Sequence, residues 1–379
     1  MSALSVRALN RALLARQGLL ERWALPPVEV VERIGAIQAQ YWPAVAVALW
    51  SRSRDLRAGD LYRELEARRL LLGTLLRGTL HVVGATDHPL YAAVVRASAA
   101  GAWRRTDAEP PAEVDTLRAD LAGYAASPRT VEELAAFVEA WIERHRPPLA
   151  AAEVAFQRAY RWRPLLASCA LVRDPAGGRW DGARPPAGLV AAPEPACASV
   201  EEALDAVVRR HLRAFGPASA DDVAGWIGWQ TPPVRAALER LGTGLARFED
   251  DGGRSLYDLP DSPRPDPEVP APIRLLPWFD SVLLAYAPRH RARVLPEAYR
   301  DRVYVRANLQ WLPTFLVDGL VAGTWSVEVA RREATLTLRS FAALPRPTRA
   351  ELTGEAERLV RFLRPAAAAH RVLVVASDG

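Results

Sequence analysis

The feature that most restricts the fold of this chain is a proline-rich segment about two thirds of the way along it. Residues 260–272 hold six prolines in thirteen positions. Because proline fixes φ and lacks an N–H donor, such a segment forms a stiff connection outside helices and sheets. A chain of 379 residues is also long enough for two or three domains of roughly 100–200 residues. We therefore expect separate folding units before and after the segment.

Before the segment, apolar residues recur at the three- and four-residue spacing of helices with one buried face. Thr130 and Glu133 add a capping-box pattern at the start of one helix. The expected helices span 4–21, 26–40, 44–52, 60–70, 87–105, 131–145, 151–160, 200–214, 220–227 and 231–241. The expected hairpins lie at 70–83, at 165–173 with a partner around Trp180, and at 244–258. Helices followed by a hairpin are the element order of a winged helix, which predicts three such regions at 1–110, 111–195 and 196–262.

After the segment, the pattern changes to short alternating or apolar runs parted by turns such as Asp318-Gly319. The runs span 273–284, 303–305, 309–317, 320–329, 334–338 and 371–375, and a helix is expected at 348–364. This spacing favours a small β-barrel or sheet with the helix packed on it. The predicted fold class is mainly α with β (α+β), with tandem winged-helix motifs and a C-terminal small β-barrel at residues 263–379.

All 49 basic residues are arginine, because the sequence contains no lysine. Codon bias in a GC-rich genome explains this as well as function does, and the net charge of +5 is modest. The absence of lysine nevertheless excludes a lysine Schiff base and a Gly-Lys-Thr phosphate loop. Arginine instead suits bidentate binding of phosphate and stacking on bases.

No metal, cofactor or membrane segment is expected. The two cysteines, Cys169 and Cys197, and the six histidines show no ligand spacing. Residues 1–20 have the pattern of an amphipathic helix containing arginines, and no run of 18 apolar residues occurs. The sequence therefore predicts a soluble, cytoplasmic protein.

Two glutamines, Gln38 and Gln40, stand one residue apart at the end of an apolar helical pattern. In a regular helix they would be about 200° apart, so they can face one point only where the helix unwinds. Pro43 favours an end to the helix near Gln40. Amides at such a position can orient a water, bond a base edge, cap the helix or satisfy a buried backbone group.

Several blocks of the chain, in order, resemble the winged-helix DNA glycosylases of the AlkZ and YcaQ type. The blocks are Ile37-Gln38-Ala39-Gln40, Ala48–Arg52, Leu76–Val83, Phe215–Ala218, Leu275–Asp280 and Asp318–Trp325. The resemblance implies tandem winged helices in a C-shaped arrangement around duplex DNA, with a C-terminal β-barrel. It also implies that Gln38 and Gln40 are catalytic, in the Gln-apolar-Gln form of the AlkZ type. The implied reaction is hydrolysis of the N-glycosidic bond of alkylated purines, including bulky adducts and interstrand crosslinks, by a monofunctional enzyme.

The expected partner is double-stranded DNA containing alkylated bases, bound by a monomer. Arginines at helix or hairpin ends can contact phosphates, and binding should weaken as salt rises. His81 either approaches DNA or bonds a backbone carbonyl, and Asp280 orders a turn or pairs with an arginine such as Arg289. The expected DNA-binding residues are Tyr41, Trp42, Arg52, Arg77, His81, Arg104 and Arg105.

Two alternatives remain at this stage. One is a non-catalytic winged-helix transcriptional regulator that reads DNA sequence, and the other is a damage-binding accessory protein without useful activity. The Gln-Ala-Gln motif favours the glycosylase, because a regulator has no need of paired amides.

Overall fold

The structure is a computed structural model that describes residues 3–57, 59–98, 112–176, 184–192 and 199–375. The predicted DNA-binding residues Arg104 and Arg105, and also Cys197, lie outside these ranges. No helix within them is both long and apolar enough to cross a membrane.

The largest core forms around helix α10 (Val200–Phe215). Ser199 caps this helix by accepting a hydrogen bond from the backbone N–H of Glu202. Apolar residues at three- and four-residue spacing, among them Val208 and Leu212, are fully buried. They pack against α1 (Val6–Arg16), α5 (His88–Ala97) and α12 (Thr231–Leu241). Helical periodicity therefore predicts the central helix correctly.

The N-terminal part continues with α2 (Pro27–Ile34), β2 (Ile37–Gln38), α3 (Pro43–Arg52), α4 (Asp60–Glu66), β3 (Leu70–Thr74) and β4 (Leu80–Gly84). The helix predicted at 26–40 is wrong in its second half. It ends at Ile34 because Gly35 has φ +90°, a conformation that glycine adopts without steric cost. The residues that follow are extended, and β2 pairs antiparallel with β4. The hairpin predicted at 70–83 is confirmed as β3 and β4.

One five-stranded sheet, in the order β2-β4-β3-β5-β6, runs across the boundary predicted at residue 110. Its last two strands are β5 (Leu171–Arg173) and the edge strand β6 (Leu189–Ala191), and β5 joins β3 through the pair Gly73 and Val172. The strand β6 lies inside the stretch 184–195, which its prolines predict to be a linker. The helices of this part are α6 (Ala112–Tyr124), α7 (Val131–His145), α8 (Ala151–Ala159) and α9 (Arg163–Ala167). Both hydrogen bonds of the predicted Thr130 capping box are present at α7.

The third part contains α10, α11 (Ala220–Ile227), α12, β7 (Ala246–Asp250) and β8 (Ser255–Asp258). The helices predicted at 220–227 and 231–241 are confirmed at those bounds. The short N-terminal strand β1 (Ala3–Leu4) adds to this unit by pairing parallel with β7.

Helix α1 also contacts the chain on the far side of the proline-rich segment. The Asn10 amide donates to the carbonyl oxygens of Arg293 and Gly319, at 2.7 and 2.8 Å. The Nε atoms of Arg7 and Arg16 donate to carbonyls of the proline-rich segment itself. This segment therefore runs along α1 and is not a free linker.

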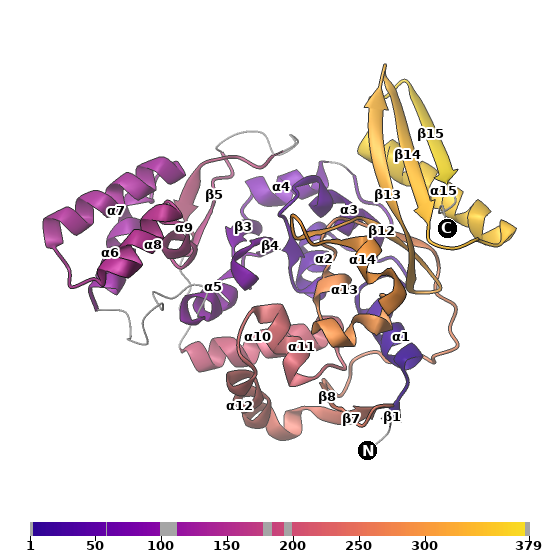
Figure 1. Cartoon of the computed structure of the whole chain (residues 1–379), viewed down its shortest axis with the longest axis horizontal. Coiled ribbons are helices and arrows are strands. Elements are labelled where there is room, and N and C mark those ends of the chain that lie inside the picture. The colour runs from indigo at the N-terminus through magenta and orange to yellow at the C-terminus, as the bar shows by residue number, and fades with distance from the viewer. Residues whose placement is uncertain (1–2, 58, 99–111, 177–183, 193–198, 376–379) are drawn as a thin grey trace.

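The C-terminal part forms an open sheet instead of the predicted closed barrel. Its elements are β9 (Arg274–Leu276), α13 (Ser281–Leu284), α14 (Arg300–Val303), β10 (Tyr304–Val305), β11 (Gln310–Trp311), β12 (Thr314–Val317), β13 (Leu320–Ala330), β14 (Glu333–Ser340), α15 (Arg346–Leu363) and β15 (Ala369–Val375). The order β15-β14-β13-β12-β9 leaves β15 and β9 as edges. Helix α15 connects β14 to a parallel β15 and covers the sheet (Figure 1), so the strands do not close on themselves.

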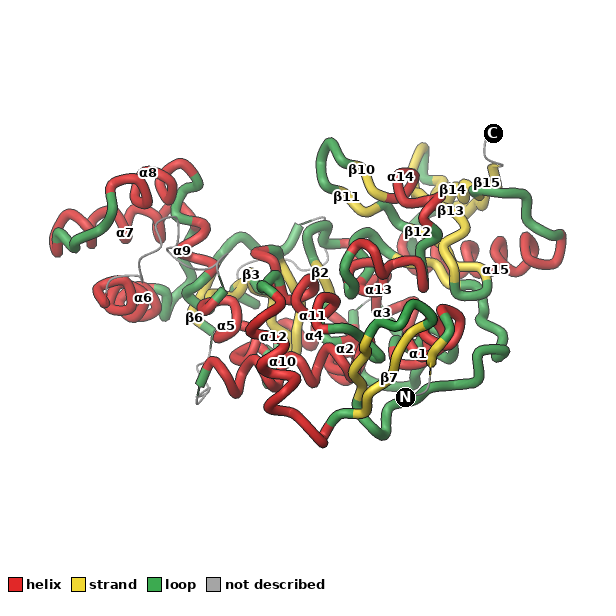
Figure 2. Tube along the Cα trace, turned by 60° about the horizontal axis from the view of Figure 1, so that its bottom comes forward, coloured by secondary structure: helices red, strands yellow, loops and turns green. Residues whose placement is uncertain are grey.

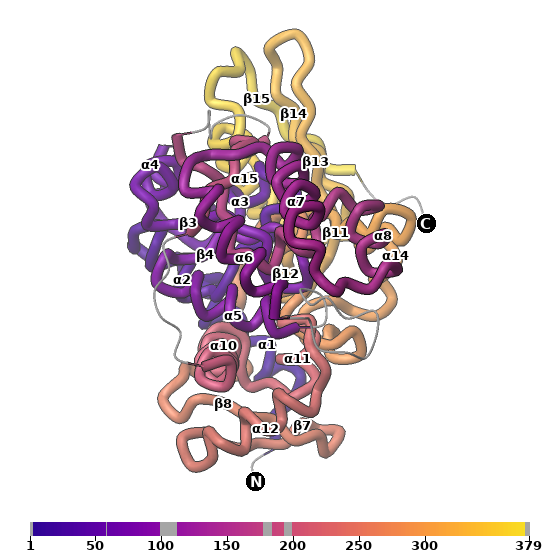
Figure 3. Tube along the Cα trace, turned by 90° about the vertical axis from the view of Figure 1, so that its left-hand side faces the viewer, coloured from indigo at the N-terminus to yellow at the C-terminus, as the bar shows by residue number. Residues whose placement is uncertain are grey.

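The parts are arranged around β2 and its neighbours. Figure 2 shows α6–α9 at one end of the molecule and the C-terminal sheet at the other, with β2 and β3 between them. Figure 3 views the molecule from the α6–α8 end. It shows β13–β15 on one side and α12, β7 and β8 on the opposite side. The glutamine motif is thus carried by the middle of the molecule.

Candidate active site

The two glutamines lie on an extended segment and bond to one turn. Gln38 pairs with His81 in the β2–β4 ladder, and the N–H of Ala39 donates to the carbonyl of Leu80 at 2.7 Å. Gln38 lies in β2, and Gln40 lies in the bend that follows this strand. Gln38 Oε1 accepts from the Arg77 guanidinium at 2.9 Å, and Gln40 Oε1 accepts from the N–H of Leu80 at 3.3 Å. The strand and the bend after it together bring both amides to residues 77–80.

Arg77 fixes the position of this turn. Its φ is +56°, and its guanidinium donates to the carbonyl of Trp226 at the end of α11 as well as to Gln38. Gly228 allows the close approach, because a Cβ there would lie 3.1 Å from the Cα of Arg77. Burial, and then the charge of Arg291, lower the pKa of Arg77 to about 10, so it remains protonated near neutral pH. Its two acceptors are protein atoms, so the structure gives Arg77 a positioning role within the site.

His81 is buried, with 2% of its surface exposed. Its Nδ1 donates to the carbonyl of Thr79 at 2.9 Å, and its Nε2 faces Arg77 at 3.5 Å. Burial, and then the Arg77 charge, lower the pKa of His81 to about 3. The structure therefore favours the carbonyl-bonding alternative over contact with DNA, and a neutral imidazole of this pKa is a poor general acid.

The hydrogen bonds define which atoms of the glutamines remain available. Arginine and backbone N–H groups can only donate, so both Oε1 atoms are acceptors in these bonds. Within the described ranges, neither Nε2 group has a hydrogen-bond partner in the protein, and each Oε1 keeps a second lone pair. Gln38 is 7% exposed and Gln40 is more open to solvent. The motif thus presents unpaired amide N–H groups without an ionised carboxylate bonded to them.

A cavity of about 550 Å³ opens beside Gln40. Its walls come from the β3–β4 hairpin on one side and from α9, β5 and β6 on the other. The lining includes Thr74, Arg77, Leu80, Leu166, Leu171 and the arginines Arg163 and Arg173. Burial, and then the charge of Arg163, lower the pKa of Arg173. The volume lies in the range of small-molecule sites. No local signal in the sequence selects Arg163, because only the β3–β5 pairing brings α9 to the hairpin.

Of the two aromatic residues that follow the motif, Tyr41 is exposed and Trp42 is buried. Tyr41 is 41% exposed, and its ring lies 4.6 Å from that of Trp278. Trp278 in turn packs edge-on against Trp325 at 5.1 Å. Trp42 is 5% exposed and belongs to the core of α2, α3 and β3, so the prediction that it faces DNA is wrong. Tyr41 and Trp278 form the aromatic surface next to Gln40, and the sequence predicts no role for Trp278.

Arg52 is not placed to contact DNA. Its side chain is fully buried, and its two terminal nitrogens donate to the Asp280 carboxylate at 2.9 and 3.0 Å. The Asp280 carboxylate also accepts from the N–H of Val282 at the start of α13. The predicted turn-ordering role of Asp280 is thus confirmed, but its arginine is Arg52, since Arg289 pairs with Asp221. The DNA contact predicted for Arg52 is wrong, because leaving the pair would strand two buried charges.

Among the described residues, no group of three or more His, Cys, Asp or Glu side chains is arranged to hold a metal ion. Cys169 is buried, which raises the pKa of its thiol to about 11. A thiol of this pKa is unreactive near neutral pH.

Three comparisons with known proteins agree with one another. The family model for DNA glycosylase AlkZ-like proteins matches residues 31–362. A Streptomyces sahachiroi protein named interstrand DNA cross-link repair glycosylase is 25% identical over 342 residues, which cover 85% of this chain and 87% of that protein. The solved structure of the Streptomyces sahachiroi DNA glycosylase AlkZ is similar in fold, with a TM-score of 0.75 and 22% identity over 99% of this chain and 100% of that chain. Because the family match covers most of the chain, this protein belongs to the AlkZ-like DNA glycosylase family.

Proposed function

We propose that this protein hydrolyses the N-glycosidic bond of alkylated purines in duplex DNA, including bulky adducts and interstrand crosslinks, with Gln38 and Gln40 positioning the water. The observation that carries the proposal is that two neutral amides bond to one hairpin, where Gln40 and the Gln38 partner Arg77 both line a cavity. Family membership and a relative named for cross-link repair support it. The three helix-and-hairpin parts then act as tandem winged helices in a C-shaped monomer that binds the duplex.

Neutral amides suit a substrate that is already activated. An alkylated purine carries a positive charge, so it leaves as a neutral base and needs little protonation. The enzyme then has to hold a water against the anomeric carbon of the sugar, in the orientation needed for attack. Gln38 and Gln40 can do this through their unpaired N–H groups and the free lone pair on each oxygen. Among the described residues, no carboxylate lines the cavity, which restricts the enzyme to such activated bases.

The charge of Arg77 decides which atoms of the glutamines face the water. Its guanidinium bonds to the oxygen of Gln38, so the amide oxygen is already polarised by the protein. Gln38 therefore acts toward the water chiefly as an N–H donor, while the more open Gln40 offers both its N–H groups and an oxygen lone pair.

The surroundings of the motif fit an extruded base and a DNA strand. The cavity has the volume of a small-molecule site, and the Tyr41–Trp278 surface offers an aromatic face for stacking. Arg163 is exposed, and within the described residues its side chain makes no hydrogen bond or ion pair. It is therefore available to a phosphate, and Arg173 extends the positive wall.

The proposal is tested with a duplex oligonucleotide that carries one N7-alkylated purine. Abasic sites are cleaved with alkali after single-turnover incubation, and the strands are separated. Gln38→Ala and Gln40→Ala should each lower the rate of base release by about 10²–10³, the cost of one positioned catalytic contact. Binding to the duplex should change little.

Gln230→Ala is the matched control, because it removes an exposed amide at the start of α12, away from the cavity. Full release rates in both motif variants would contradict the catalytic assignment. Absence of release with any adduct, together with tight binding to one undamaged sequence, would instead favour a transcriptional regulator. Binding to damage without release would favour an accessory protein.

A further inference from the structure

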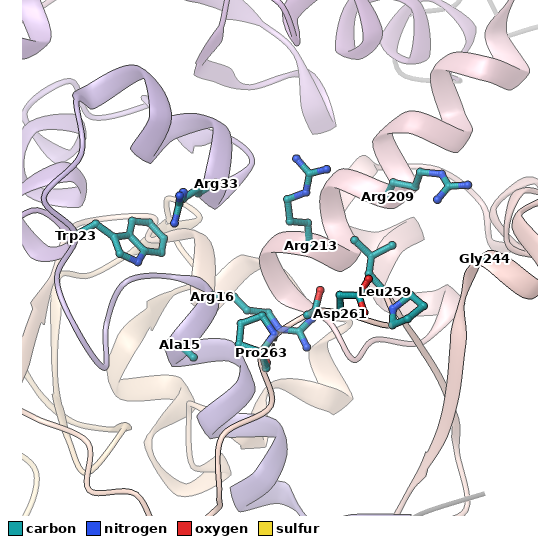
Figure 4. A pocket seen from close by; sticks show the side chains of 12 residues that line it. Ala15, Arg16, Trp23, Arg33, Arg209, Arg213, Gly244, Leu259, Asp261 and Pro263 are labelled. Carbon is teal, nitrogen blue, oxygen red and sulfur yellow. Dashed lines mark hydrogen bonds between the residues drawn. The ribbon is translucent and has the colours of Figure 1, made fainter.

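A second pocket lies apart from the glutamine motif. It has a volume of about 690 Å³ and shares no lining residue with the cavity beside Gln40. Its walls are formed by α2, α10, the end of α1 and the start of the proline-rich segment (Figure 4). Among the described residues that line it, four are arginines and the single carboxylate is Asp261.

Three of these arginines have free charges. Arg33, Arg209 and Arg213 are exposed, and in the described part of the chain none of them makes a hydrogen bond or an ion pair. Other exposed arginines of the described ranges, such as Arg163, are also unpaired, but these three line one pocket. Arg209 and Arg213 are four residues apart on α10 and therefore lie on one face of the helix. Figure 4 shows Arg33 and Arg213 extending toward the space between α2 and α10.

The buried carboxylate beneath the pocket, Asp258, does not pair with these three arginines. Arg16 is buried there and bonds to both oxygens of Asp258, at 2.6 and 2.8 Å. Asp258 also accepts from Arg264 at 2.6 Å. Its carboxylate is thus shared by two guanidinium groups and is not available to Arg33, Arg209 or Arg213.

The pocket also holds one of its free arginines in place. The guanidinium carbon of Arg33 lies 5.4 Å from the centre of the Trp23 ring, within the range of a cation–π contact. The Trp23 ring also packs against Gly18, where an added Cβ would lie 2.9 Å from the ring. Trp23 therefore packs on the backbone and supports Arg33. Trp23 thus orients a charge and is itself half-buried.

We infer that this pocket binds the phosphodiester backbone of a DNA strand, as a site separate from the cavity beside Gln40. Three unpaired guanidinium groups match phosphate oxygens, which accept bidentate hydrogen bonds from arginine. Binding to phosphates through charge requires no base recognition. The inference does not depend on base release, because it concerns undamaged DNA.

The test measures the affinity of the full chain for a fluorescein-labelled, twelve-nucleotide oligothymidylate by fluorescence anisotropy across a series of salt concentrations. The triple variant Arg33→Gln, Arg209→Gln, Arg213→Gln should weaken binding about tenfold or more at low salt. Each phosphate contact on a single strand contributes roughly 0.7 to the slope of log affinity against log salt, so the slope should fall by about 2. The three side chains are exposed and make no hydrogen bond or ion pair within the described residues, so the variant should stay folded and lose only the contact of Arg33 with Trp23.

Arg235→Gln is the matched control, because it removes an exposed arginine from α12 outside the pocket. It should change the affinity less than twofold. An unchanged affinity of the triple variant, or an equal loss per charge in Arg235→Gln, would overturn the inference. Inorganic pyrophosphate provides the second arm of the test. If it binds the wild type but not the triple variant, while strand binding is the same in both, the site takes free phosphate and the strand assignment fails.

Discussion

The sharpest test of the proposed mechanism is the substitution Arg77→Met. It removes the guanidinium that bonds to Gln38 Oε1 at 2.9 Å and to the carbonyl of Trp226, while it keeps a long apolar side chain. A hydrogen bond from a charged donor contributes about 1.5–3 kcal/mol. If this energy holds the Gln38 amide in its productive orientation, its loss lowers the rate of base release by about 10- to 100-fold.

Three measurements separate this positioning role from the DNA contact that the sequence predicts for Arg77. Single-turnover base release at saturating enzyme should fall in Arg77→Met, while duplex affinity and its salt dependence stay near wild type. The double variant with Gln38→Ala should release base no more slowly than Gln38→Ala alone, since both changes remove the same function. Arg235→Met, which removes an exposed arginine of α12, is the control and should release base at the wild-type rate.

Two outcomes would refute the reasoning. The first is a wild-type release rate in Arg77→Met, which would show that Gln38 needs no partner. The second is a salt slope reduced by about 1, together with weaker duplex binding, which would show that Arg77 neutralises a phosphate.

Further predictions concern stability and the dependence on pH. Asp280→Ala should lower the free energy of unfolding by about 3–5 kcal/mol, because it leaves the Arg52 guanidinium buried without its partner; a urea midpoint close to wild type would contradict this. Burial lowers the pKa of His81 to about 3 and those of His88 and His211 to about 4, so the unfolded chain binds protons that the folded chain does not. The free energy of unfolding should therefore be highest above about pH 6.5. Toward pH 4 it should fall by up to about 1.4 kcal/mol per pH unit for each histidine. Urea unfolding of the wild type and the histidine-to-asparagine variants at pH 7.5 and 5 measures the difference. Base release should be independent of pH between about 6 and 9, since no group bonded to the glutamines titrates there, and a bell-shaped profile would show a general acid or base.

Local patterns predict the elements of this fold better than their assembly. The bounds of α7, α11 and α12 follow from helical periodicity, and capping boxes at Thr130 and Ser219 mark the starts of α7 and α11. Periodicity predicts a helix for the glutamine motif because the apolar spacing continues past Ile34. The left-handed conformation of Gly35 overrides that spacing. The predicted barrel is wrong because the strands form an open sheet. The crossover through α15 places β15 parallel to β14 at one edge, and β9 is the other edge.

The roles of individual arginines could not be predicted from the sequence. Arg52 and Arg77 both stand at the ends of elements, where phosphate contact is easy. Their actual partners, Asp280 and the carbonyl of Trp226, are 228 and 149 residues away along the chain. A chain with only arginine as its basic residue gives no local signal that separates a buried guanidinium from one exposed to DNA. The motif itself could be recognised, because Gln38 and Gln40 are close in sequence.

The contacts of α1 decide how this protein can be cut or recombined. Helix α1 bonds to the proline-rich segment and to the carbonyls of Arg293 and Gly319 in the C-terminal part, and the strand before it joins β7. A fragment that starts at the proline-rich segment would therefore expose backbone acceptors that α1 now satisfies. A fragment that stops there would lose the surface on which α1 rests. The stretch that looks in the sequence like a natural place to divide the chain is held from both sides, so truncation or domain exchange at that point should yield insoluble halves.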